Sequence, residues 1–220
     1  MLAARCERGS AQARILLGVG GVELATPSQP IALALREATK GVHERLGRAL
    51  PLANPELTLD RYRVVVEAYY GFYAPLEARL AVAAAKSDGV VPMRGREKLW
   101  RLRQDLHALG STDGRIDALP RCTWVPEIST VARALGCLYV IEGATLGGRI
   151  VARAVGEHLG LGPSNGACFF EGYGPATGAM WRSFLHGLKA CARSRDEAVE
   201  AAVDTFAALE RWLSAQGVLR

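Results

Sequence analysis

Several features that would assign a chain to a special class are missing from this sequence. It has no uninterrupted run of about 18 apolar residues, the minimum expected of a membrane-spanning helix. Its five cysteines are scattered and form no Cys-x-x-Cys pair, which argues against a zinc or disulfide framework and favours free thiols in a reducing cytosol. No segment resembles a nucleic-acid-binding motif. We therefore expect a cytoplasmic protein that binds neither membranes nor nucleic acids.

Strand-like alternation of apolar and polar residues is also absent, and the repeating pattern is helical throughout. The chain has 220 residues, half of them apolar, which is enough for a proper core. We expect a single all-α domain, a multi-helix bundle of roughly seven helices, over residues 29–216. Residues 1–28 are predicted to be a poorly ordered N-terminal extension. The expected helices cover residues 31–50, 58–86 with a kink or split at Pro75, 96–109, 128–159, 175–193 and 195–216, with loops over 111–127 and 160–174.

The most unusual of these helices is apolar yet rich in glycine. Between Leu135 and Val155 it carries Gly136, Gly143, Gly147 and Gly148. Each glycine inside a helix costs roughly 0.5–1 kcal/mol relative to alanine. The first three of these glycines, with Val140, share one face of the helix. Two readings are open: a neighbouring helix packs closely against this face, or a flat ligand lies there with a small molecule bound between it and the backbone.

The first predicted helix carries a histidine in a setting that suits haem. Arg36 lies two turns before His43 on the same face, about 10 Å away along the axis, and Thr39 lies between them. Histidine is a common axial ligand of haem iron, and arginine forms forked hydrogen bonds with carboxylates such as those on the haem rim. The alternative is a histidine at the polar edge of an amphipathic helix. We assign that role to the remaining histidines, which are His107, His158 and His186.

Three segments together carry a resemblance to a known family. LREATKGVHERL, LYVIEGATLGGR and FFEGYGPATGAMWRSFL, in this order, resemble the haem oxygenase family, especially its bacterial, biliverdin-producing members. The resemblance covers roughly residues 31–215. It implies a haem held between a proximal helix, with His43 as the iron ligand, and a kinked distal helix. It further implies that O2 binds on the distal side and that haem is opened to biliverdin, by default the α isomer, with release of carbon monoxide and ferrous iron.

The same resemblance assigns roles to other residues. Gly143 and Gly147 would press on the distal haem face and steer bound oxygen, and would thus be the catalytic positions. Arg182 matches a family arginine that steers a propionate, and with Arg36 it would fix the rotation of the haem. The chain departs from the family at Ala144, where some members have a carboxylate, and at Gly47, where a glutamate commonly contacts the histidine.

We infer the partner that supplies electrons from the net charge and from the resemblance. The net charge of +5 suits an acidic electron donor, for which we expect ferredoxin or a flavoprotein reductase, such as a flavodoxin reductase system. We expect the protein to be a monomer.

Two other functions stay open. One is a haem-binding carrier or sensor on the same fold without turnover, which the residues at 144 and 47 motivate. The other is a non-haem member of the wider helical superfamily, such as a thiamin-degrading enzyme or a di-iron oxidase. A di-iron site needs Glu-x-x-His pairs, and the sequence has none. A nucleophilic thiol is conceivable at Cys137, but an apolar helix face disfavours a thiolate.

Overall fold

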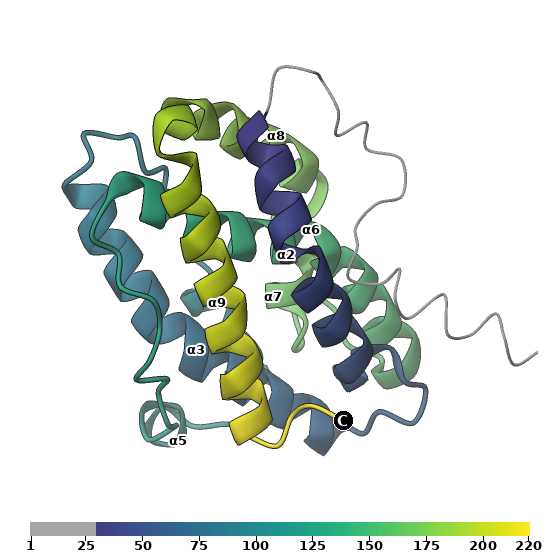
Figure 1. Cartoon of the computed structure of the whole chain (residues 1–220). Helices are drawn as coiled ribbons and strands as arrows, with labels where there is room; N and C mark the ends of the chain where they lie inside the picture. Colours follow the sequence, from purple (N-terminus) through teal and green to yellow (C-terminus); the bar gives the residue numbers. More distant parts are fainter. Residues whose placement is uncertain (1–29) are drawn as a thin grey trace, which may run out of the picture.

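The computed structural model describes residues 30–220, and every regular element in that range is a helix (Figure 1). The prediction of an all-α fold is confirmed, and the predicted extension, residues 1–28, lies outside the described residues. The α-helices are α2 Pro30–Ala49, α3 Leu59–Ala85, α4 Leu99–Ala108, α5 Asp113–Asp117, α6 Val131–Leu159, α7 Cys168–Glu171, α8 Thr177–Gly187 and α9 Arg195–Ala215. Short 3-10 helices are η1 Pro51–Ala53, η2 Gly174–Ala176 and η3 Leu188–Ser194.

Two short helices occupy segments that were predicted to be loops. α5 lies within residues 111–127, where the Thr112 side chain accepts a hydrogen bond from the Arg115 N–H and caps the helix. α7 lies within residues 160–174, and the buried carboxylate of Asp105 accepts hydrogen bonds from its first two N–H groups. Helices of four or five residues are too short to show a 3.6-residue period, so the loop predictions were wrong at these two places.

The long helix α3 tolerates a proline without being split. Thr58 caps its N-terminus by accepting a hydrogen bond from the Arg61 N–H at 3.2 Å. Pro75 has no N–H to offer the carbonyl of Gly71 four residues earlier. The Cys122 N–H donates to that carbonyl instead, at 2.9 Å. The loop before α6 therefore supplies the hydrogen bond that the proline removes.

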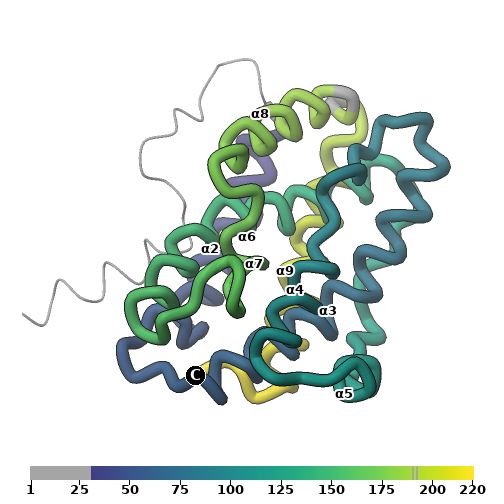
Figure 2. Tube along the Cα trace, turned by 180° about the vertical axis from the view of Figure 1, so that it is seen from behind, coloured from purple at the N-terminus to yellow at the C-terminus, as the bar shows by residue number. Residues whose placement is uncertain are grey.

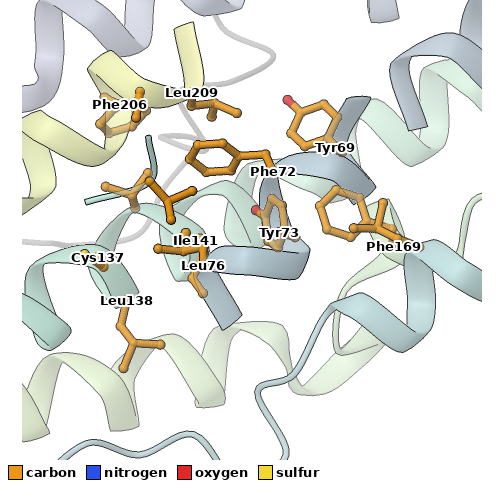
Figure 3. Packing of buried hydrophobic residues seen from close by; sticks show 14 of the residues in the cluster. Tyr69, Phe72, Tyr73, Leu76, Cys137, Leu138, Ile141, Phe169, Phe206 and Leu209 are labelled. Atoms are coloured by element: carbon orange, nitrogen blue, oxygen red, sulfur yellow. The ribbon is translucent and has the colours of Figure 1, made fainter. Parts of the chain in front are cut away.

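The core is built around α6, which packs along α9, while α2 also packs on α9 (Figures 1 and 2). The interior joins aromatic side chains of α3 to aliphatic side chains of α6 and α9. In Figure 3, Phe72 of α3 points toward Leu209 of α9, and Tyr73 lies beside Phe169 of α7. The Tyr73 and Phe169 rings meet edge to face with centroids 5.1 Å apart.

One glycine of α6, Gly136, allows α6 and α9 to pack closely. A Cβ atom on Gly136 would lie 2.1 Å from the carbonyl oxygen of Ala198 on α9 and 3.0 Å from the Cβ of Ala201. The reading that a neighbouring helix packs on the glycine face is therefore correct at Gly136, and the inclusion of this residue in a ligand-facing surface was wrong.

Among residues 30–220, one helix has the length and composition of a membrane span, although the sequence predicted none. By length and mean hydropathy alone, α6 could cross a membrane. Within its most apolar window, however, 67% is buried inside the protein, as in the core helix of a globular domain. This single helix is weak evidence for a membrane span.

Candidate active site

The predicted proximal residues lie along one side of α2. Thr39 is buried, and its hydroxyl donates to the Leu35 carbonyl at 2.7 Å. His43, one turn later, is half-buried, and its imidazole meets the Phe206 ring of α9 edge-on, with centroids 5.9 Å apart at 89°. Arg36, at the other end of this row, is exposed. The row thus begins at the surface with Arg36, is buried at Thr39, and contacts α9 at His43.

Tyr139 lies on α6, the predicted distal helix, and connects this helix to the row. Burial raises the pKa of its phenol to about 12, while the nearby charge of Arg36 and a hydrogen bond with the Thr39 side chain oppose the shift. Two of the predicted ligand-binding residues therefore meet α6 at one tyrosine. Tyr139 precedes Gly143 by four residues and lies on the same face of the helix.

Trp181 of α8 completes the surroundings of Gly143. Its ring packs on Tyr139 with centroids 5.6 Å apart. The first atom that a Cβ on Gly143 would meet is the Trp181 Cη2, at 4.0 Å, which is an ordinary van der Waals contact. The Trp181 indole N–H is buried and has no hydrogen-bond partner among the described residues. The open backbone at Gly143 therefore borders the ring of a tryptophan whose N–H is buried and unpaired, and a buried unpaired donor calls for an explanation such as a bound group.

The structure brings some predicted residues together and leaves others apart. Arg36, Thr39 and Gly143 converge on Tyr139 and Trp181. Gly147 is buried one turn beyond Gly143 on α6. Arg182 follows Trp181 in the sequence but is exposed, and its guanidinium lies back along α8 near Gly178.

Gly148 has a packing role, like Gly136. A Cβ atom there would lie 2.7 Å from the Phe170 carbonyl oxygen of α7. Gly136 and Gly148 thus allow the backbones of α9 and α7 to approach α6, whereas no other backbone segment in the described part of the chain lies against Gly143.

Sequence reasoning missed a buried ionic cluster directly before Gly143. We call it the Glu142 cluster, and its members are Arg96, Lys98, Glu142 and Tyr173. Glu142 is 2% exposed, and its Oε1 accepts hydrogen bonds from Lys98 Nζ at 2.8 Å and Tyr173 Oη at 2.6 Å. Arg96 Nη1 donates to the other carboxylate oxygen. Burial lowers the pKa of Lys98, and the charge of Glu142 opposes this shift. The signal in the sequence was Glu142, a glutamate in the most apolar part of this helix, because a buried carboxylate requires cationic partners.

The residues considered for other chemistries do not form a second centre. Within residues 30–220, no three His, Cys, Asp or Glu side chains gather as a metal site would require. Four cysteines in this range are free and buried, as expected, while Cys6 lies outside it. Burial raises the pKa of Cys137, which disfavours a nucleophilic thiolate there. Two surface clefts, of about 310 and 630 Å³, lie near Trp124 and Arg79 and include none of the predicted site residues.

The chain is similar to known proteins over most of its described length. The family model described as "Heme oxygenase" matches residues 29–215. A heme oxygenase of Xanthomonas campestris pv. campestris is 30% identical over 173 residues, which are 75% of this chain and 96% of that protein. The fold is similar to that of NO- and CO-bound heme oxygenase from Neisseria meningitidis, with a TM-score of 0.70, 20% identity, and coverage of 84% of this chain and 91% of that one. Heme oxygenase from Leptospira interrogans gives a TM-score of 0.68 at 16% identity, covering 84% and 98%. The chain therefore belongs to the haem oxygenase family, whose members are haem-degrading oxidoreductases.

Proposed function

We propose that this protein opens haem to biliverdin, carbon monoxide and ferrous iron in a reaction that needs O2 and a reductant. The observation that carries the proposal is the open backbone at Gly143, bordered by Tyr139 and the buried donor of Trp181. When bound, haem supplies both the iron that activates O2 and the ring that is oxidised. The protein must hold and orient it.

His43 would hold the iron through its imidazole. Its edge-on contact with Phe206 restricts the rotation of the ring, so the nitrogen keeps one direction. A neutral imidazole donates less electron density than a thiolate, which favours attack on the ring over early O–O cleavage. The glutamate that commonly supports this histidine in the family is replaced by Gly47, which is buried and offers no side chain.

Gly143 and Gly147 would form the distal wall. Without side chains, this backbone leaves room for a bent diatomic ligand and directs it sideways. The Trp181 N–H is a donor held away from bulk water, where a hydrogen bond to developing negative charge is strongest. This donor would take the place of the carboxylate that some members have at the position of Ala144.

Two arginines would fix the rotation of the substrate through its carboxylates. Arg36 is exposed beside Tyr139, and Arg182 is exposed on α8 next to Trp181. Both guanidiniums lie at the surface, where propionates would emerge into solvent. Their placement on opposite elements would favour one orientation of the ring.

The test is a haem degradation assay with the purified protein. Haem, a reductant and catalase are added, and decay of the Soret band should accompany the rise of a biliverdin band. His43→Ala should bind haem more weakly and lose activity, and added imidazole should restore part of it. His186→Ala, which changes an exposed histidine of α8, is the matched control and should behave as the wild type. Absence of bile pigment with the wild type would refute the proposal.

A second candidate function is a carrier or sensor that binds haem without turnover. The observation that favours it is Ala144, which cannot hold the water chain that a carboxylate would organise. A stable oxygenated or ferrous complex that persists in the presence of reductant would select this function over the first.

A further inference from the structure

The side chain of Arg96 joins α6, which carries the open backbone at Gly143, to α8, which carries Trp181. It is 3% exposed. Its Nη1 donates to the Glu142 carboxylate of α6, and its Nη2 donates to the Met180 carbonyl of α8 at 3.1 Å. The guanidinium also lies over the Phe184 ring of α8, 5.8 Å from its centroid. One planar group thus ties two helices with two hydrogen bonds.

Both anchor points lie directly beside site residues. Glu142 is followed by Gly143, and Met180 is followed by Trp181. The distance between the bare backbone and the indole therefore depends on how Arg96 spans the gap. Its fork has a fixed geometry, with donors in one plane, so it sets a spacing that a flexible ammonium would not set.

The other side chains of the Glu142 cluster hold the carboxylate, and Tyr173 reaches α8 only through its backbone N–H, which donates to Thr177 Oγ1 at 3.2 Å. Lys98 Nζ contacts the Arg96 carbonyl at 3.0 Å, Glu142 and the Tyr173 hydroxyl. Tyr173 donates its own hydrogen to Glu142. These contacts balance the buried charge and fix the Glu142 end of the link. Within residues 30–220, the side chain of the cluster that contacts α8 is that of Arg96, at Met180 and Phe184.

We propose that Arg96 is a positioning residue, which sets the spacing between Gly143 and Trp181 and thereby the direction in which a distal ligand on haem is held. This rests on the proposed function, because it concerns the distal side of the same site. A merely structural Arg96 would change the stability of the fold. A positioning Arg96 also changes the properties of a distal ligand in a protein that remains folded.

The test compares Arg96→Lys with the wild type. Lysine keeps the charge beside Glu142 but cannot donate to Glu142 and Met180 in one plane. The matched control is Arg103→Lys, because Arg103 also donates through both of its terminal nitrogens, to Asp113 and Asp117, but on the surface. Three quantities are measured: haem affinity by Soret titration, the rate of carbon monoxide dissociation from the ferrous complex, and the ratio of biliverdin isomers.

We expect Arg96→Lys to bind haem within about threefold of the wild type, to change the carbon monoxide dissociation rate by about tenfold, and to raise the share of minor isomers. The control should alter none of the three. The effect of Arg96→Lys should also be smaller when Trp181 is already phenylalanine, because Arg96 acts through the position of that ring.

A second variant covers the case that Arg96→Lys does not fold. Glu142→Asp keeps the buried negative charge and shortens the link, and it should change the same two distal properties. If either variant folds and matches the wild type in both carbon monoxide dissociation and isomer ratio, the proposal is overturned. If the wild type makes no biliverdin, the proposed function fails, while the carbon monoxide measurement still decides the role of Arg96.

Discussion

At the scale of single residues, the glycines of α6 differ in what a side chain would meet. A Cβ on Gly143 meets its first atom at 4.0 Å, whereas a Cβ on Gly136 meets a carbonyl oxygen at 2.1 Å. The same residue type therefore serves two purposes within two turns of one helix. A side chain at position 143 would enter open space beside Trp181, whereas a side chain at position 136 would clash with the backbone of α9.

Gly143→Leu should bind haem and turn it over at least about 100-fold more slowly, because the side chain fills the space that a distal ligand needs. Gly143→Ala should keep the fold and gain up to about 1 kcal/mol of helix stability. Binding is measured by Soret titration, turnover by biliverdin formation, and stability by thermal unfolding. Full turnover by Gly143→Leu would contradict a close distal wall.

Asp105 is the residue that should make stability depend on pH. Burial raises the pKa of its carboxyl to about 6, against the opposing effect of hydrogen bonds from the Cys168 and Phe169 N–H groups. The folded state therefore binds the Asp105 proton more tightly than the unfolded state does. The stability that this proton adds is fully present below the ordinary pKa of 3.8 and is lost as the pH rises through the folded-state pKa of about 6.

The free energy of unfolding of the wild type, relative to Asp105→Asn, should therefore fall between about pH 4 and pH 6, by on the order of 3 kcal/mol. Urea unfolding of both proteins across this range measures the difference, and other titrating groups cancel. A constant difference would mean that Asp105 titrates near its ordinary pKa in the folded protein.

At the scale of elements, the contact between α6 and α9 fixes where the site forms. α9 carries Phe206, which contacts His43, and it also receives Gly136 of α6. The proposed proximal helix α2 and the proposed distal helix α6 are thus positioned on a common support. A change in the approach of α6 to α9 would move the proposed distal wall relative to the imidazole.

Gly136→Ala should destabilise the protein by about 2 kcal/mol or more, because overpacking a core typically costs 1–3 kcal/mol and here the clash is with backbone. Gly114→Ala in α5 is the matched control, since a Cβ there meets nothing within 4 Å. Its stability should be equal to or slightly above that of the wild type. Thermal unfolding of the haem-free proteins measures both, and equal melting temperatures would contradict the close approach.

At the scale of the whole molecule, the excess of positive charge should govern the encounter with an electron donor. With a net charge of +5, association with an acidic ferredoxin should slow as salt screens the attraction. The KM for such a donor should rise several-fold between about 50 and 300 mM salt, while turnover with a small uncharged reductant should change little. An equal response to salt with both reductants would exclude electrostatic steering.

Much of the fold could be predicted from periodicity. The long helices, the cap at Thr58 and the end of the first helix before Pro51 follow from local patterns that their own residues carry. The short helix α7 could not be predicted, because Asp105, far away in the sequence, supplies its cap. The continuity of α3 through Pro75 likewise depends on a distant N–H, that of Cys122.

The candidate site divides in the same way. Local spacing was enough to predict an all-α chain with His43, Arg36 and Thr39 on one helix face and Gly143 on another, because spacing along a helix fixes which residues share a side. Tertiary packing is what places Gly136 against a helix, Tyr139 and Trp181 beside Gly143, and Arg96 between α6 and α8. Such contacts depend on the distance between segments far apart in the chain, which no local pattern specifies.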